Sequence, residues 1–243
     1  MVSGTMDLWG LALLDFFNGD TDTPLTTCRD DGIVWHFSVS DCFREATYWS
    51  TEKMALSHCR GRVLDVGAGT GLHALHLQEQ GLSVCAVNIS PGACEVMRKR
   101  GVNDVQCVDI ATFRAEPFDT VLIIGRTIGM VEDLPHLQRF LEDVRGLVKS
   151  DGQILLNSLD VRCTNNATDL AYQEANRQAG CYFGELRLRF EYRGQKGSTF
   201  GWLYVEPETL AHQAHRSGWL YETVMQQEDG NYLARLTPSE CVP

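Results

Sequence analysis

A glycine-rich loop follows the first strongly apolar strand that the sequence predicts, and it constrains the fold more than any other feature. Residues 62–66, RVLDV, have the composition of a buried strand, and residues 67–71 read GAGTG. Glycine has no Cβ and adopts positive φ angles easily, so such a loop can turn sharply and let a ligand approach the backbone. The sequence therefore predicts a ligand site between a strand and the helix that follows it.

Strands and helices alternate from this loop onward. Such alternation predicts an α/β fold with a parallel sheet and crossover helices. The next predicted strands are residues 83–89, 104–110, 118–125 and 154–160. A further helix begins at Pro207, and two strands joined at Asp229-Gly230 end the chain. An antiparallel pair at the end makes the predicted sheet mixed.

Two segments lie outside this alternation. Residues 1–60 predict a helical leader or cap, with helices at 7–17 and 50–59 around a loop-rich stretch, and residues 61–243 predict the ligand-binding domain. Within that domain, residues 161–184 are irregular, and residues of about 185–205 predict an inserted antiparallel hairpin. Apolar and charged residues alternate strictly along its first strand, ELRLRFEYRG, so one face of the hairpin must be buried.

The spacing of the glycines separates the possible ligands. The loop reads Asp65-x-Gly67-x-Gly69-x-Gly71. A dinucleotide fingerprint, GxGxxG, would need glycine or alanine where Leu72 stands, and a phosphate-binding P-loop would need a terminal GK[ST]. The loop therefore matches neither the dinucleotide-binding motif nor the P-loop well, although an NAD(P)-dependent oxidoreductase stays an alternative.

The DxGxGxG pattern closely resembles motif I of the class I S-adenosylmethionine (SAM)-dependent methyltransferases. The resemblance continues through VNIS (87–90), CVDI (107–110), FDTVLIIG (118–125) and LVKSDGQILL (147–156), and it covers roughly residues 55–158. It implies a Rossmann-like, seven-stranded mixed sheet and SAM as the cofactor. The leader and the C-terminal segment YLARL also resemble a widespread group of small bacterial methyltransferases.

The resemblance also implies which residues bind the cofactor. Asp65 matches the carboxylate near the amino group of SAM, Asn88 stands where the family usually has an acidic residue at the ribose, and Asp109 matches the acceptor for the adenine amino group. Asn88 offers one acceptor and a donor where a carboxylate accepts twice, which predicts weaker cofactor binding. The full set implied is Asp65, Gly67, Ala68, Gly69, Gly71, Asn88, Ile89, Asp109, Ile110, Gly125 and Arg126.

The acceptor of the methyl group is less constrained, because methyl transfer from a sulfonium is an in-line displacement that depends mainly on alignment. The fourth predicted strand ends IIGRTIG and lacks the Asp/Asn-Pro-Pro-Tyr motif of base and amide methylation, and Arg126-Thr127 replaces the Asn-Gly typical of the small bacterial group. Arg44 is a candidate to neutralise the SAM carboxylate or to make a surface ion pair, and His73 is expected to pack without a catalytic role. Candidate catalytic or acceptor-site residues are His36, Tyr48, Arg126, Ser158 and Asp160.

Composition excludes several partners. A formal net charge of −11 repels phosphate backbones and disfavours nucleic acid. The cysteines include no CxxC, and residues such as Cys85 and Cys107, within predicted strands, are expected to be buried thiols in a reducing cytoplasm. We expect a cytoplasmic monomer or homodimer without metal or membrane partner that methylates oxygen, nitrogen or sulfur of a small molecule, or else binds SAM without catalysis.

Overall fold

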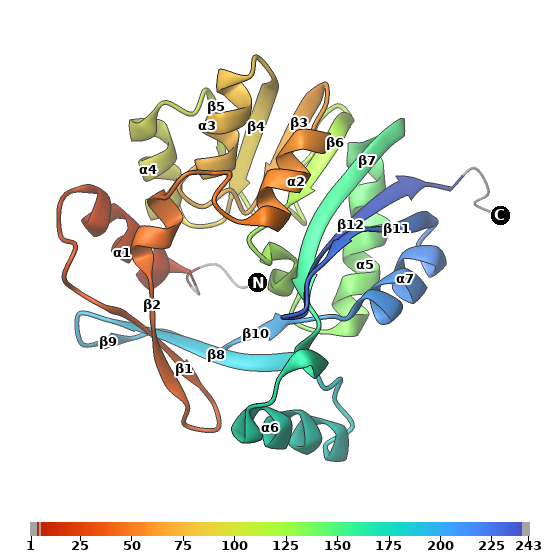
Figure 1. The fold of residues 1–243 in the computed structure, drawn as a ribbon. Coiled ribbons are helices and arrows are strands. Elements are labelled where there is room, and N and C mark those ends of the chain that lie inside the picture. Colours follow the sequence, from red (N-terminus) through yellow and green to blue (C-terminus); the bar gives the residue numbers. More distant parts are fainter. Residues whose placement is uncertain (1–3, 5, 240–243) are drawn as a thin grey trace. The chain divides into compact units, whose positions relative to one another are not determined.

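The computed structural model describes residue 4 and residues 6–239, and the chain divides into two compact units (Figure 1). Unit 1 comprises residues 1–114 and 187–200, and unit 2 comprises residues 115–186 and 201–243. Within the described ranges, no helix is long and apolar enough to cross a membrane.

Unit 1 contains the N-terminal segment, the glycine loop and most of strand β8. Its elements are α1 (Asp7–Phe17), β1 (Leu25–Arg29), β2 (Val34–Phe37), η1 (Val39–Phe43), α2 (Ser50–His58), β3 (Arg62–Val66), α3 (Leu72–Glu79), β4 (Ser83–Asn88), α4 (Pro91–Arg100), β5 (Asp104–Cys107), β8 (Glu185–Tyr192) and β9 (Gln195–Lys196).

Unit 2 contains the remaining strands and helices. Its elements are β6 (Phe118–Ile123), η2 (Thr127–Val131), α5 (Leu134–Val144), η3 (Arg145–Leu147), β7 (Val148–Leu159), η4 (Val161–Cys163), α6 (Ala167–Gln178), most of β10 (Phe200–Leu203), α7 (Pro207–Arg216), β11 (Trp219–Gln226) and β12 (Asn231–Pro238).

The larger sheet has the strand order β11-β12-β7-β6-β3-β4-β5, which confirms the predicted seven-stranded mixed sheet. Strands β3, β4 and β5 pair in parallel, as do β6 and β7. Strand β12 pairs antiparallel with β11, as the Asp229-Gly230 turn predicts, and it also pairs antiparallel with β7. The central strands are buried on both faces, so their apolar runs are continuous.

A smaller sheet has the order β10-β8-β1-β2, with β9 paired to β8. Its strands β1 and β2 occupy residues where the sequence predicts a loop. Strand β1 lacks apolar alternation, because it buries Thr27 and Arg29 beside Leu25. It pairs antiparallel with β8, about 160 positions further along the chain, with Thr27 opposite Phe190. A partner so distant in sequence leaves no local pattern.

The predicted apolar face of the 185–205 segment is mostly buried, as expected, and only Leu186 at its start is half-buried. Leu188, Phe190 and Tyr192 are each less than a tenth exposed. Phe190 packs against Phe200 with ring centroids 5.1 Å apart, and the Tyr192 hydroxyl donates to Asp15 Oδ2 of α1 at 3.1 Å. The hairpin therefore packs against the leader in unit 1.

Two further expectations differ from the structure. Helix α6 forms inside the stretch predicted to be irregular, because Asn166 caps it through the backbone N–H groups of Thr168 and Asp169. Only Gln173 of this helix is buried, so no apolar period marks it. Cys107 is exposed rather than buried, since it ends β5 at the edge of the larger sheet, whereas Cys85 in β4 is buried.

Candidate cofactor site

The glycine loop joins β3 to α3 and bends through three positive φ angles. Gly67, Gly69 and Gly71 have φ angles of 70°, 59° and 77°. The backbone N–H groups of Gly67 and Ala68 donate to the carbonyl of Val87 in β4, at 2.9 and 3.1 Å, and hold the loop at the end of the sheet. A Cβ on Gly71 would lie 2.5 Å from Val102 Cγ2, so packing as well as conformation requires glycine there.

Nine of the eleven residues that the sequence predicts to bind the cofactor lie in unit 1. They follow or end three adjacent parallel strands, whose carboxyl ends meet at one edge of a sheet, where ligands of such folds bind. The nine are Asp65, Gly67, Ala68, Gly69 and Gly71 at β3, Asn88 and Ile89 at β4, and Asp109 and Ile110 after β5.

Asp65 is the most deeply buried ionisable group of this edge. It is 1% exposed, and its Oδ2 atom has no hydrogen-bond partner among the described residues. Burial raises the pKa of the Asp65 carboxyl to about 6. An unsatisfied buried carboxylate oxygen is costly, and a cationic ligand group would remove that cost.

Asn88 and Asp109 are both partly engaged by the backbone. Asn88 Oδ1 accepts from the Ser90 N–H at 2.9 Å, which leaves its amide N–H donors to meet a ligand hydroxyl. Asp109 Oδ1 accepts from the Ala111 N–H at 3.0 Å, and its second carboxylate oxygen stays available. Each side chain therefore shapes a turn and still offers a polar atom.

Gly125 and Arg126 lie in unit 2, directly after β6, and both have positive φ angles. The Arg126 N–H donates to Asn157 Oδ1 at 2.8 Å. Its guanidinium donates to Asn231 Oδ1 at 2.7 and 3.0 Å, so the side chain is held at the start of β12. Because Asn231 holds the Arg126 side chain, Gly125 and Arg126 would contact a ligand through their backbone atoms.

The candidate catalytic residues are each exposed or bound to another group. His36 is exposed on β2, with Nδ1 3.4 Å from Thr26 Oγ1, and Tyr48 is 67% exposed against the edge of Trp49. In unit 2, Asp160 caps η4 and pairs with Arg162 at 2.6 Å, and that hydrogen bond holds the Asp160 pKa below its usual value. Ser158 is buried and accepts from the Val205 N–H at 3.1 Å.

The structure also reveals contacts on the glycine loop that the sequence did not predict. Trp9 of α1 lies beside it, with Cη2 3.6 Å from the position that a Cβ on Gly69 would take. Thr70 donates a short hydrogen bond to the carbonyl of Cys42 in η1. Arg100 of α4 donates to both oxygens of Thr70, at 2.8 and 2.9 Å, and lies over the Phe43 ring. The sequence signal that was available for this packing is Gly10, inside the predicted helix 7–17, because a glycine within a helix marks the close approach of another backbone.

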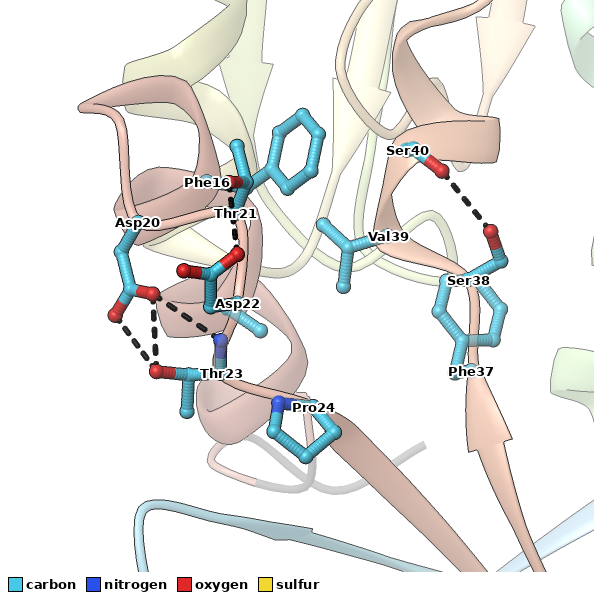
Figure 2. A pocket seen from close by; sticks show the side chains of 11 residues that line it. Phe16, Asp20, Thr21, Asp22, Thr23, Pro24, Phe37, Ser38, Val39 and Ser40 are labelled. Atoms are coloured by element: carbon cyan, nitrogen blue, oxygen red, sulfur yellow. Dashed lines mark hydrogen bonds between the residues drawn. The ribbon is translucent and has the colours of Figure 1, made fainter.

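A separate pocket of about 400 Å³ lies within unit 1 (Figure 2). Phe16 of α1, Phe37 of β2 and Val39 of η1 form its apolar surface. Across it, Asp20 accepts from Thr23 and from Arg193 at 2.7 Å, and these hydrogen bonds lower its pKa to about 2. None of the predicted cofactor residues lines this pocket, so it is distinct from the edge of the sheet described above.

Comparison with known proteins identifies the class. The family model described as "Methyltransferase domain" matches residues 64–156. A SAM-dependent methyltransferase from Bacteroides fragilis, solved with S-adenosylhomocysteine (SAH), is 31% identical, with a TM-score of 0.85 over 98% of both chains. The CcbJ methyltransferase of Streptomyces caelestis shares the fold at 14% identity, with a TM-score of 0.62 over 78% of this chain and 89% of its own.

A curated relative is more distant. The ubiquinone biosynthesis O-methyltransferase of Xylella fastidiosa is 27% identical over 107 residues, and the match spans 42% of its length and 41% of this chain. The seven-stranded sheet, the glycine loop and the full-length similarity to the Bacteroides fragilis enzyme all indicate the same class of protein. The chain belongs to the class I SAM-dependent methyltransferases, as the sequence motifs predicted.

The residues of this chain fit that family's cofactor. SAM carries an ammonium, a ribose and an adenine but no phosphate, and the loop has no P-loop lysine. The unsatisfied Asp65 Oδ2 matches the ammonium, the Asn88 amide matches a ribose hydroxyl, and Asp109 matches the adenine amino group. Within the described residues, no three His, Cys, Asp or Glu side chains gather to hold a metal ion.

Proposed function

We propose that this methyltransferase transfers the methyl group of SAM to an oxygen, nitrogen or sulfur atom of a small molecule. The supporting observation is the leader's contact with the glycine loop, through Trp9 against Gly69 and Thr70 with Cys42. A segment that covers the loop restricts the room for an acceptor and favours a small molecule over a polymer. The net charge of −11 likewise disfavours nucleic acid as the methyl acceptor.

The residues of this chain act by binding, orienting and excluding water. When bound, SAM supplies an electrophilic methyl group on a sulfonium, which an acceptor attacks in line. We assign cofactor binding to Asp65, the glycine backbone, Asn88 and Asp109 in unit 1, and we assign Gly125 and Arg126 in unit 2 to it through their backbone. Alignment of two reactants provides much of the rate enhancement of such displacements.

We further propose that the leader, residues 1–60, and the hairpin of about 185–205 together cap the transferase domain. The pairing of β1 with β8 and the Tyr192–Asp15 hydrogen bond support a joint cap. Because the hairpin's apolar face is buried in this contact, a role of the hairpin as a dimer interface is less favoured. Size-exclusion chromatography with light scattering decides between a monomer and a homodimer.

Turnover with an acceptor panel tests the function. Purified protein with SAM is offered amines, alcohols, phenols and thiols, and also RNA and a protein extract, while SAH formation is measured. We expect SAH above the acceptor-free background with at least one small molecule and none with Asp65→Asn. Turnover confined to RNA or protein acceptors would overturn the small-molecule assignment.

A further inference from the structure

Two cysteines of unit 1 lie beside the same backbone carbonyl, at the edge of the sheet that carries the predicted cofactor residues. Cys94 of α4 is fully buried, and its thiol donates to the carbonyl oxygen of Asn88, with Sγ at 3.4 Å. The N–H of Val108 donates to the same oxygen at 3.1 Å, and Cys107 directly precedes Val108. Both cysteines therefore border Asn88, one from a helix and one from the neighbouring strand.

The strand register and a hydrogen bond bring the two thiols together. Cys107 stands opposite Asn88 in the parallel pair of β5 and β4, so the two side chains leave the same face of the sheet. Helix α4 packs against both strands. Burial chiefly, and a hydrogen bond with the Cys107 thiol in addition, raise the pKa of Cys94 to about 12. Cys107 is exposed, because β5 is the outer strand of the larger sheet.

We propose that Cys94 and Cys107 form a modification site for hydroperoxides, which oxidise the pair to an intramolecular disulfide that weakens cofactor binding. An exposed thiol next to a buried one suits this reaction, because the peroxide meets the exposed sulfur first and the second sulfur resolves the intermediate. The inference goes beyond methyl transfer, since neither cysteine has a part in it.

The oxidation balances with hydrogen peroxide as the co-reactant. The Cys107 sulfur attacks one peroxide oxygen, an S–O bond forms as the O–O bond breaks, and the released hydroxide leaves as water with the thiol proton. The Cys94 sulfur then attacks the sulfenic sulfur, an S–S bond forms as the S–O bond breaks, and a second water carries away the Cys94 proton. The two thiols lose two electrons and two protons, and one peroxide becomes two waters.

The disulfide changes the surroundings of two predicted cofactor residues. A disulfide sulfur carries no proton, so the Asn88 carbonyl loses its thiol donor. The new bond also ties α4 to the end of β5, which leads into Asp109. The loss of cofactor affinity rests on the proposed roles of Asn88 and Asp109 at the ribose and the adenine, whereas formation of the disulfide does not. By linkage, bound SAH should disfavour the disulfide by the same factor.

Mass spectrometry and calorimetry on the full chain test both parts. Reduced protein is treated with hydrogen peroxide, its remaining thiols are alkylated under denaturing conditions, and it is digested with trypsin. We expect a linked pair of peptides, residues 63–98 and 101–114, whose fragmentation assigns the bond to Cys94 rather than Cys85. The affinity for SAH should fall about fivefold or more on oxidation and return with dithiothreitol.

Matched variants separate the pair from other oxidation. Cys94→Ser and Cys107→Ser should bind SAH about as tightly as the reduced wild type, and they should keep that affinity after peroxide. Cys163→Ser removes a different exposed thiol, and it should retain the linked peptides and the full loss of affinity. If Cys94→Ser does not fold, Cys94→Ala removes the thiol without burying a hydroxyl.

Absence of the linked peptides would overturn the proposal, and so would an equal loss of affinity in Cys94→Ser. Linked peptides with unchanged SAH affinity would overturn the effect on the cofactor. Dithiothreitol does not restore oxidised methionine, so a loss that persists with it also counts against the pair. These measurements need no methyl acceptor, so they stand apart from a failure to find turnover.

Discussion

Gly10 of α1 and Gly92 of α4 lie in close backbone contact, and the two helices pack against each other. A Cβ on Gly92 would overlap the Gly10 carbonyl and lie 3.1 Å from its Cα, and a Cβ on Gly10 would overlap the Ser90 hydroxyl. Neither helix can approach the other so closely with a larger residue. This contact sets where Trp9 lies relative to the glycine loop.

Substitution of Gly92 by alanine should therefore loosen the leader. The obstructing atoms are backbone, which cannot rotate away, so we expect a loss of about 1–3 kcal/mol in the free energy of unfolding. Chemical denaturation measures it, and limited proteolysis should cut the leader faster. Gly146→Ala is the matched control, since its Cβ would meet nothing within 4 Å. Equal stability of the two variants would contradict the close crossing.

Trp9→Ala should weaken SAH binding several-fold. The indole borders the loop at Gly69, and its removal opens the loop to water on that side. Calorimetry measures the affinity, and the indole fluorescence of the wild type should respond to SAH while that of Trp9→Phe responds less. The exposed Trp35 provides a control, because its replacement should leave SAH affinity unchanged. A normal affinity in Trp9→Ala would remove α1 from the cofactor site.

Asn88→Asp should tighten cofactor binding. One carboxylate oxygen can keep the Ser90 N–H while the other accepts from a ribose hydroxyl, which adds a charge-assisted bond of about 1–2 kcal/mol. Titration with SAH measures the change. Asn103→Asp adds the same charge at an exposed site and should have little effect. Weaker binding in Asn88→Asp would argue against Asn88 as the ribose ligand.

SAH affinity should rise between about pH 5 and pH 7 because ionised Asp65 binds the ammonium and its pKa is about 6 in the free protein. For stability the sign is opposite. The pKa of Asp65 in the folded protein lies above the ordinary aspartate value of 3.8, so this group stabilises the free protein most below pH 4, and that contribution is lost as the pH rises through 6. Comparison of wild type with Asp65→Asn isolates both trends. A pH profile shared by the two proteins would assign the titration to a group other than Asp65.

Local patterns predicted the parts of this protein that depend on neighbouring residues. The three glycines, the carboxylate before them and the apolar strands predicted the loop and the mixed sheet, because φ preferences and burial of β-branched runs act within a few residues. The resemblance to the methyltransferase motifs predicted that Asp65, Asn88 and Asp109 lie near the ends of successive strands.

Other features depended on partners far along the chain. Strand β1 forms opposite β8 and so left no apolar period. Helix α6 begins at a local cap, Asn166, but it buries only Gln173 and therefore left no apolar period either. From the sequence, Arg44 was a candidate to bind the SAM carboxylate or to make a surface ion pair, and Asp160 was a candidate acceptor-site residue. Their ion-pair partners, Glu52 and Arg162, could not be identified from it. Charged side chains choose partners by position in space, which composition and spacing do not encode.

The sequence by itself determined the class of protein and the place of the glycine loop, since both follow from short-range backbone preferences and a motif order along the chain. Only the tertiary structure decided which surfaces meet that loop. The Gly10–Gly92 contact, the Trp9 contact and the Arg44–Glu52 ion pair each join residues from separate elements. Packing and desolvation between segments far apart in the sequence select such contacts, so local patterns do not specify them.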